Sequence, residues 1–272
     1  MMAVAGWPIR AIAVGLGILL LVAVSSSEIL AEDRIGVVLM HGKRGKVGAG
    51  TLIGPLEEAL RDTGIAVVAP EMPWSRDRFL DKTFRGILAE IDAAVTFLKS
   101  DGVTRIVVGG HSLGGGAALA YGARRDGLAG VLVIAPGHFP ESRGFRKRFG
   151  ADVAEAKSMV AAGNGAETAD FRDIDRGDSR PFVMRADAYV DFMDPEGPLA
   201  MPENAASLKP DTPLLLIIGK KDHTFRYGRG DRDYIFDKAP SHPKSRYTVV
   251  PGGHKATPRI GKDEIVAWLK SL

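Results

Sequence analysis

Short apolar runs alternate with helical stretches from Arg34 to the end of the chain, and this alternation limits the possible fold more than any other feature. Six runs are predicted to be strands: Ile35–Met40, Ile65–Ala69, Arg105–Gly109, Val131–Ala135, Leu214–Ile218 and Tyr247–Val250. Nearly all of their residues are apolar, as in strands buried on both faces of a parallel sheet. Helices are expected between the strands, at Leu56–Arg61, Ile87–Lys99 and Asp263–Lys270. The pattern predicts an α/β fold, a mostly parallel sheet of about six strands flanked by helices.

The alternation stops between about residues 138 and 210, where charge, Gly and Pro dominate and only short apolar clusters remain. Two short helices are expected there, at Ala154–Ala162 and Arg185–Phe192. A segment of this length between two strands indicates an insertion in one domain, residues 32–272, rather than a second domain. Since it follows a strand end, we expect it to form a cap or lid above the sheet.

Residues 1–31 have the pattern of an export signal. Arg10 and the amino terminus are positive, and Ala11–Val24 is an apolar run of 14 residues, shorter than the ~20 that a membrane-spanning helix needs. Ala31 offers a small residue for cleavage before Glu32. We expect a cleaved signal peptide and a periplasmic or secreted protein, the alternative being an uncleaved membrane anchor.

Charge and cysteine content exclude several classes of function. The formal net charge is only +3, from 36 Lys and Arg against 33 Asp and Glu, so nothing favours a nucleic-acid partner. The chain has no cysteine, which excludes a lipoprotein anchor, disulfide bonds and a thiol nucleophile.

The segment Gly110-His111-Ser112-Leu113-Gly114 follows the third predicted strand and precedes a helix start rich in Gly and Ala. A strand, a sharp turn and a helix in this order strain the serine backbone and leave room only for small residues on either side, which explains Gly110 and Gly114. Ser112 is therefore the candidate nucleophile. The helix after it points its first N–H groups toward an oxyanion formed there. The alternative is an ordinary glycine-rich turn with an incidental serine.

A serine hydroxyl needs a base to remove its proton and a carboxylate to orient that base. Of the six histidines, His254 follows the last strand directly, in Gly252-Gly253-His254, so it should lie at the same end of the sheet as Ser112. The alternative is a histidine that only caps the closing segment. Asp222 is the best carboxylate because it leaves the penultimate strand four residues after Ile218, and Glu141 is the fallback.

The order Ser112, Asp222, His254, each just past a strand, resembles the α/β-hydrolase superfamily over nearly the whole stretch from Arg34 to Leu272. Three further motifs support the resemblance: His41-Gly42 after the first strand, Leu214–Gly219 leading to Asp222, and the turn at His254. The resemblance implies an oxyanion hole made by the backbone N–H groups of Leu113 and Lys43. His41, Gly42, Arg44 and His111 are expected to contact the substrate. The antiparallel hairpin usual at the start of this family has no room after residue 31.

The predicted reaction is acyl transfer to Ser112 followed by hydrolysis, with His254 as the base and Asp222 orienting it. A carboxylic ester of a small molecule is the expected substrate. Thioesters, lactones and amides or peptides use the same groups and stay open, as does a non-catalytic ligand-binding protein on the same fold. No cofactor is expected, and no metal, because no metal-ligand spacing is present. Membrane contact is expected only if the N-terminal segment stays uncleaved.

Two basic clusters have open interpretations. The loop Lys43-Arg44-Gly45-Lys46 should lie near the site entrance, where it could attract an anionic acyl or leaving group, or could simply be solvated. The cluster Arg143, Arg146, Lys147 and Arg148 at the start of the insertion could contact anionic lipid or be an exposed charged face.

Overall fold

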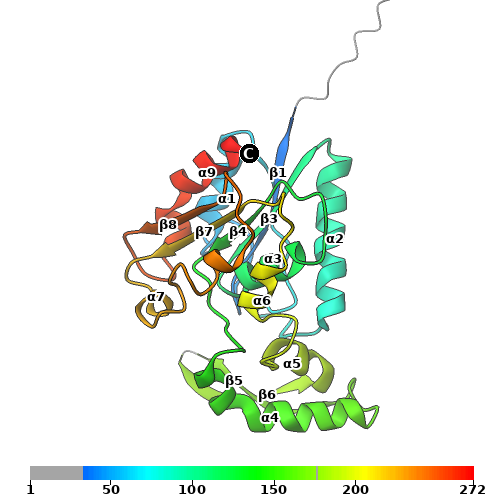
Figure 1. Ribbon diagram of the computed structural model, residues 1–272. Coiled ribbons are helices and arrows are strands. Elements are labelled where there is room, and N and C mark those ends of the chain that lie inside the picture. The colour runs from blue at the N-terminus through cyan, green and yellow to red at the C-terminus, as the bar shows by residue number, and fades with distance from the viewer. Residues whose placement is uncertain (1–32, 176) are drawn as a thin grey trace, which may run out of the picture. The chain divides into compact units, whose positions relative to one another are not determined.

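A computed structural model describes residues 33–175 and 177–272 of the chain (Figure 1). The expected export signal, residues 1–31, lies outside the described residues. Among the residues that are described, no helix combines the length and apolar character needed to cross a membrane.

Six parallel strands form the central sheet, in the order β2-β1-β3-β4-β7-β8. Their bounds are β1 Ile35–Met40, β2 Ala66–Val68, β3 Arg105–His111, β4 Gly130–Ile134, β7 Leu214–Gly219 and β8 Arg246–Val250. The predicted fold class and all six predicted strands are confirmed. Because the strands run the same way, their carboxyl ends share one edge of the sheet.

Helices cover both faces of this sheet, as strands that are apolar on both sides require (Figure 1). Val37 and Leu39 of β1 pack with α1 (Gly54–Asp62) and α9 (Lys262–Ser271) in one hydrophobic cluster. Val38 and Met40, one residue along, pack in a second cluster with α2 (Phe84–Ser100) and α3 (Leu113–Gly122). Successive side chains of β1 thus point to opposite faces of the sheet, so one apolar run contributes to two hydrophobic clusters. α8 (Thr257–Ile260) precedes α9.

The segment between β4 and β7 is more regular than the sequence indicated. It holds α4 Arg143–Ala161, β5 Thr168–Asp175, β6 Asp178–Arg185, α5 Ala186–Met193 and α6 Met201–Ala206. The expected helix at Ala154–Ala162 is the second half of the longer α4, and the antiparallel β5–β6 hairpin was not expected at all. Its strands carry many charged residues on their exposed side, so the sequence there lacks the apolar run by which the other strands are predicted.

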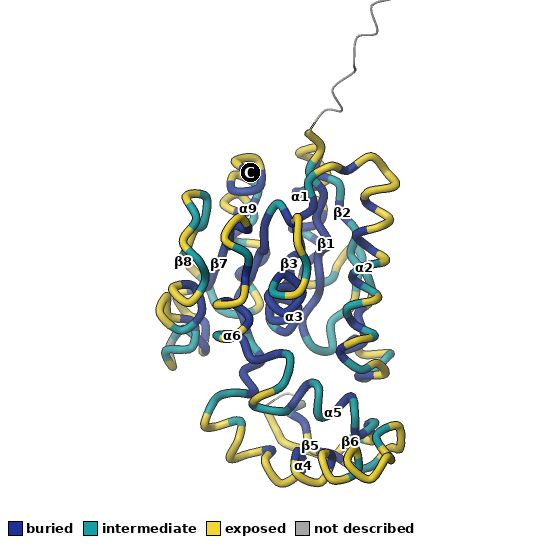
Figure 2. The backbone as a smooth tube through the Cα atoms, turned by 45° about the vertical axis from the view of Figure 1, so that its right-hand side comes forward, coloured by how far each residue is buried: buried dark blue, intermediate teal, exposed yellow. Residues whose placement is uncertain are grey.

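The inserted elements share a core with the sheet. Phe149 of α4, Phe171 of β5 and Tyr189 of α5 belong to the same hydrophobic cluster as α2 and α3. The rings of Phe171 and Tyr189 stack with their centroids 4.5 Å apart. Figure 2 shows buried backbone continuing from the sheet into this group of elements. The connection between β7 and β8 adds only α7 (His223–Arg226) and a short 3-10 turn at Phe236–Lys238.

Candidate functional site

Ser112 occupies a strained turn between β3 and α3. Its backbone has φ 57° and ψ −118°, a region that residues with side chains rarely adopt. A Cβ atom at Gly110 would lie 2.7 Å from the Met40 carbonyl oxygen, and one at Gly114 would lie 2.6 Å from the same oxygen. Only glycine fits at both positions, as expected from the sequence. The geometry leaves the Ser112 side chain at the carboxyl edge of the sheet.

Asp222 and His254 are in direct contact. Nδ1 of His254 donates a hydrogen bond to Oδ2 of Asp222 at 2.8 Å. The other carboxylate oxygen, Oδ1, accepts from the backbone N–H and from the hydroxyl of Thr224, both at 2.9 Å. Asp222 is completely buried. Burial raises its pKa, but the hydrogen bonds and charge of His254 and the bonds from Thr224 outweigh this, so the pKa of the carboxyl lies below its ordinary value.

Gly137, just beyond β4, shows how close Ser112 lies to His254. A Cβ atom at Gly137 would clash with Ser112 Oγ, and would lie 2.7 Å from Cε1 and 3.1 Å from Nε2 of His254. Both catalytic candidates therefore border the same small space. No hydrogen bond joins Oγ to Nε2 within residues 33–175 and 177–272, and catalytic hydrogen bonds of this kind often tighten only when substrate binds.

The loop after β1 lies against the nucleophile turn. A Cβ atom at Gly42 would lie 3.0 Å from the Ser112 Cβ. In this loop the N–H of Arg44 donates to the Trp74 carbonyl and that of Gly45 to the Gly42 carbonyl, whereas the N–H of Lys43 has no acceptor among the described residues. The N–H of Leu113 opens α3, where the helix itself offers no acceptor. Among the described residues, the N–H groups of Lys43 and Leu113 are thus both without a backbone acceptor.

His41 and His111 do not contact the cavity, contrary to the sequence-based expectation. His41 is buried, with Nδ1 donating to the Gly42 carbonyl at 2.8 Å and Nε2 accepting from the Met72 N–H at 3.1 Å. His111 donates from Nε2 to the carbonyl of His254 at 3.0 Å. Burial, with the nearby charge of His254, lowers the pKa of His111 to about 3. Neutral His41 therefore fixes the loop after β1, and neutral His111 fixes the turn that carries His254.

Side chains of the loop after β1 reach the inserted elements. Nζ of Lys43 is 2.6 Å from Oδ1 of Asp173 on β5. The guanidinium of Arg44 lies 4.7 Å from the ring centroid of Phe79 and 4.8 Å from that of Phe182 on β6. These contacts join the Gly42–Lys43 backbone to the β5–β6 hairpin.

Ser112 and His254 open into a cavity of about 990 Å³. Lys43 and Arg44 are among its lining residues, and Gly42 is not. Its apolar wall consists of Phe139, Phe145, Phe149 and Ile174, of which the last three belong to α4 and β5. The inserted elements therefore form part of the cavity.

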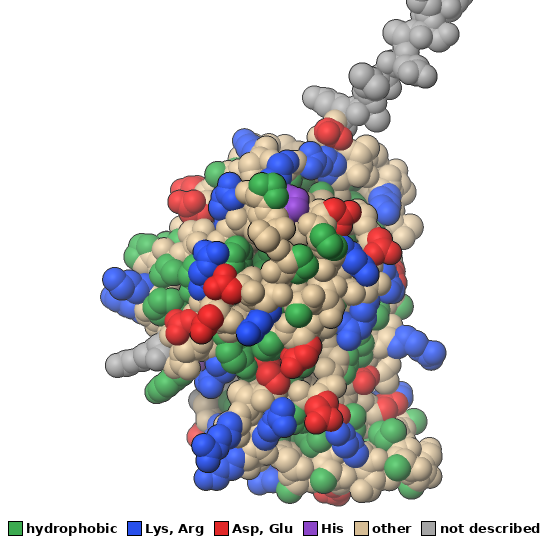
Figure 3. All heavy atoms as spheres, in the orientation of Figure 1, with side chains coloured by type: hydrophobic (Ala, Val, Ile, Leu, Met, Phe, Trp, Pro, Cys, Tyr) green, Lys and Arg blue, Asp and Glu red, His purple; other side chains and the backbone are tan. Residues whose placement is uncertain are grey.

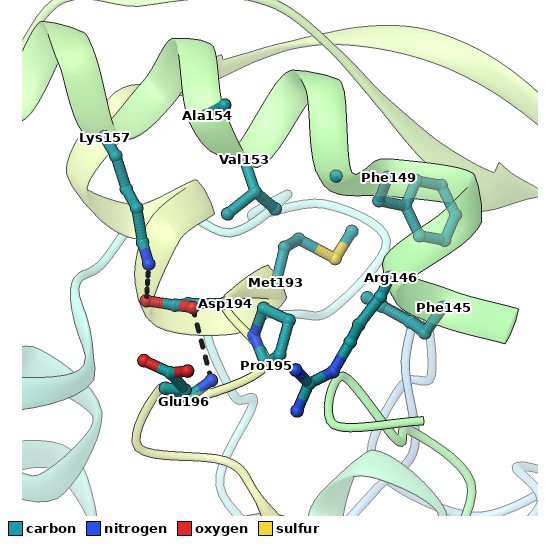
Figure 4. Close-up of a pocket in the computed structure, with 11 residues that line it drawn as sticks. Phe145, Arg146, Phe149, Val153, Ala154, Lys157, Met193, Asp194, Pro195 and Glu196 are labelled. Carbon is teal, nitrogen blue, oxygen red and sulfur yellow. Dashed lines mark hydrogen bonds and ion pairs between the residues drawn. The ribbon is translucent and has the colours of Figure 1, made fainter. Parts of the chain in front are cut away.

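A second, smaller cavity of about 270 Å³ lies along α4 and contains no candidate nucleophile (Figure 4). Lys157 and Asp194 bridge it at 2.7 Å. Phe145 and Phe149 line both cavities. Glu141, the fallback carboxylate, instead accepts a hydrogen bond from the Tyr234 hydroxyl at 2.8 Å.

Asp222, His223 and His254 are the one group of described residues with metal-ligand atoms close together, all within 4.8 Å. Nδ1 of His254 is already bonded to Asp222, and both Asp222 oxygens accept hydrogen bonds from protein donors. This arrangement serves to orient an imidazole, and the donors around it compete with any cation.

Sequence reasoning missed Thr224 and Gly137. Thr224 follows Asp222 by two residues, and the motif Asp-x-Thr at a helix start is a capping signal that could have indicated it. Gly137 carries no local signal, because its importance arises from the packing of β4 against α3 and the turn at His254.

Comparisons with known proteins identify the family of the chain. The model of the Alpha/beta hydrolase family matches residues 37–262. No curated protein matches the chain significantly in sequence.

Solved structures share the fold at low identity. A structure from the metagenome-derived lipolytic enzymes LipS and LipT is 19% identical with a TM-score of 0.56, covering 88% of this chain and 95% of its own. A thermostable carboxyl esterase of Bacillus coagulans is 15% identical with a TM-score of 0.61, covering 88% and 89%. Proline iminopeptidase of Mycobacterium smegmatis is 14% identical with a TM-score of 0.54, covering 87% and 89%. At such identities the likeness concerns the fold alone.

Proposed function

Because the chain belongs to the α/β-hydrolase family, we propose that it is a serine hydrolase that cleaves carboxylic esters through an acyl-enzyme on Ser112. The observation that carries the proposal is the hydrogen bond between His254 and the buried Asp222, beside a serine with φ 57°. A structural histidine in a surface turn needs neither a completely buried carboxylate partner nor a strained serine next to it.

The first step forms the acyl-enzyme. Nε2 of His254 takes the Ser112 hydroxyl proton as Oγ attacks the ester carbonyl carbon. The carbonyl oxygen becomes an oxyanion, to which the N–H groups of Leu113 and Lys43 donate. His254 then gives its proton to the alkoxide leaving group as the carbon–oxygen bond breaks, and the alcohol departs.

The second step releases the acid. His254 takes a proton from water, the resulting hydroxide attacks the acyl-enzyme, and the proton returns to Ser112 Oγ as the carboxylic acid leaves. Asp222 remains ionised throughout, since its pKa lies below the ordinary value, and it stabilises the imidazolium that forms twice per cycle.

The inserted elements, residues 138–210, serve in this proposal as a cap that shapes the acyl pocket, since Phe145 and Phe149 of α4 line the cavity. Residues 1–31 serve as an export signal, which places the reaction outside the cytoplasm. N-terminal sequencing of the mature protein tests the cleavage before Glu32.

Labelling with a fluorophosphonate probe tests the nucleophile. The wild-type chain should label and hydrolyse p-nitrophenyl butyrate. Ser112→Ala should do neither, because the variant lacks the hydroxyl that lies beside the imidazole of His254. Ser158→Ala, an exposed serine of α4, is the matched control and should behave as wild type. A folded wild-type chain that never labels would overturn the proposal.

A panel of acyl compounds distinguishes the bond that is cleaved. The thioester and the p-nitroanilide of butyrate use the same attack but different leaving groups. We expect the ester to have the largest kcat/KM, and a larger value for the anilide would make the protein an amidase.

A further inference from the structure

The cavity at Ser112 carries six cationic side chains and no acidic one among its described lining residues. They are Lys43, Arg44, Arg76, Arg148, Arg229 and Lys255. They come from five different segments: the loop after β1, the stretch between β2 and α2, helix α4, the β7–β8 connection, and the turn after His254. A run of neighbouring basic residues is usually a solvated loop. Convergence of five segments on one cavity has no such local explanation.

Most of this positive charge is not neutralised by the protein. Lys43 pairs with Asp173. Arg76, Arg148, Arg229 and Lys255 form no ion pair with a carboxylate of residues 33–175 and 177–272. Outside the cavity some arginines are paired, as in Arg78 with Glu90, Arg125 with Asp92 and Arg172 with Asp152. Others, such as Arg85 and Arg259, form no ion pair among the described residues either. Four cations without an ion pair among the described residues therefore line one cavity, and none of its described lining residues is acidic.

Apolar and cationic surfaces alternate around the same space. Phe149 is completely buried, Phe139 is nearly so, and the guanidinium of Arg229 lies 5.6 Å from the Phe139 ring centroid. On α4, Arg148 stands between the apolar Phe145 and Phe149 as a cavity residue. A ligand that fits here combines an apolar body with negative charge.

We propose that the substrate is an ester with an apolar body and a carboxylate or phosphate group, the anion being bound by Arg148, Arg229 and their cationic neighbours. The inference rests on the proposed function and names its substrate class. Guanidinium groups bind both anions in a bidentate manner, so the chemistry is shared. Cations lining a cleft also raise the rate at which an anionic ligand arrives.

Helix α4 offers a matched pair of variants. Lys147 and Arg148 are both exposed and follow Arg146 in the same basic cluster, but Lys147 does not line the cavity. Figure 3 shows Lys and Arg side chains over the region of α4 on the face it presents. Binding by general surface charge, as to an anionic membrane, would depend on both Lys147 and Arg148. Of these two residues, binding inside the cavity should depend only on Arg148.

Titration calorimetry on the Ser112→Ala chain tests the anion site without turnover. Suberate and n-octyl phosphate are the anionic ligands, and 1-octanol is the neutral one. At least one anion should bind more tightly than octanol and weaken as salt rises, and the tighter of the two identifies the group. Adding Arg148→Gln or Arg229→Gln should weaken it by about threefold or more, and Lys147→Gln should change nothing. Equal loss with Lys147→Gln, or no anion binding, would overturn the inference.

Kinetics of the wild-type chain separate this inference from the proposed function. The readout is the ratio of kcat/KM for mono-p-nitrophenyl suberate to that for p-nitrophenyl octanoate. We expect a ratio above about 10 that falls with salt and with Arg148→Gln, but not with Lys147→Gln. Hydrolysis of the octanoate without any such preference would contradict the anion site and leave the ester hydrolase standing. Suberate binding without hydrolysis of either ester would support the anion site and contradict the proposed ester hydrolase.

Discussion

Asp222 shows how a single buried charge is made tolerable and useful. It is completely buried, and each of its oxygens accepts hydrogen bonds, Oδ2 from His254 and Oδ1 from Thr224. A buried carboxylate without such donors would be protonated or would destabilise the fold. The bond to Oδ2 favours the imidazole tautomer with Nδ1 protonated, and in the proposed mechanism Nε2 then accepts the Ser112 proton. His111, bonded to the His254 carbonyl, holds the backbone of that turn.

Replacing Asp222 by Asn should leave the fold intact and lower kcat by about 10³- to 10⁴-fold, because the amide no longer selects the tautomer and orientation of His254. Stopped assays with p-nitrophenyl butyrate measure the rate, and thermal unfolding checks the fold. Asp233→Asn, an exposed carboxylate of the same β7–β8 connection, is the control. Near-normal turnover in Asp222→Asn would contradict the proposed role of Asp222.

At the scale of elements, the ends of β3 and β4 and the start of α3 are packed so tightly that glycine is required at several points. Gly110 and Gly114 let α3 approach the Met40 carbonyl, and Gly137 leaves the space in which Ser112 and His254 meet. The two glycines of the turn belong to a sequence motif, whereas Gly137 is distant from it along the chain. The short distance between strand ends is what makes all three necessary.

Gly137→Ala should abolish most activity without unfolding the protein. Its Cβ would occupy the space between Ser112 Oγ and His254, and its backbone does not need a positive φ. We expect at least a ~100-fold loss of kcat/KM, as for other small misplacements of catalytic groups. Gly150→Ala, in α4 with open space around its Cβ position, is the control and should keep activity. Activity within a few-fold of wild type in Gly137→Ala would contradict the proposed meeting point.

For the whole molecule, buried neutral histidines link stability to pH, and His111 and His138 have the largest downward pKa shifts among them. Burial, with the charge of nearby Lys43, lowers the pKa of His138 to about 4, and burial lowers that of His111 to about 3. In the unfolded chain both return to ~6.5. Between pH 6.5 and 4 the unfolded state therefore binds more protons than the folded state, and protonation favours unfolding.

The free energy of unfolding should fall as pH drops below 6.5, by about 1.4 kcal/mol per pH unit for each of these histidines. Above pH 7 both histidines are neutral in the folded and the unfolded chain, so the free energy of unfolding should no longer depend on their protonation. Urea titrations at several pH values measure this slope. His138→Gln keeps a donor for the Phe192 carbonyl but does not titrate, so its slope below pH 6.5 should be shallower by up to that amount. Above pH 7 the free energies of unfolding of wild type and His138→Gln should differ by an amount that does not change with pH. Identical slopes throughout would contradict the assignment.

The sequence alone determined the parallel sheet, the turn at Ser112 and the positions of Asp222 and His254 at strand ends, because these features depend on local periodicity and on the order of elements. Only the tertiary structure decided the β5–β6 hairpin, the use of His41 and His111 as internal supports, and the role of Gly137. Only the tertiary structure also brought Arg76, Arg148, Arg229 and Lys255 to one cavity. Contacts between residues far apart in the chain carry no local signal, since burial and charge pairing are settled when the elements pack.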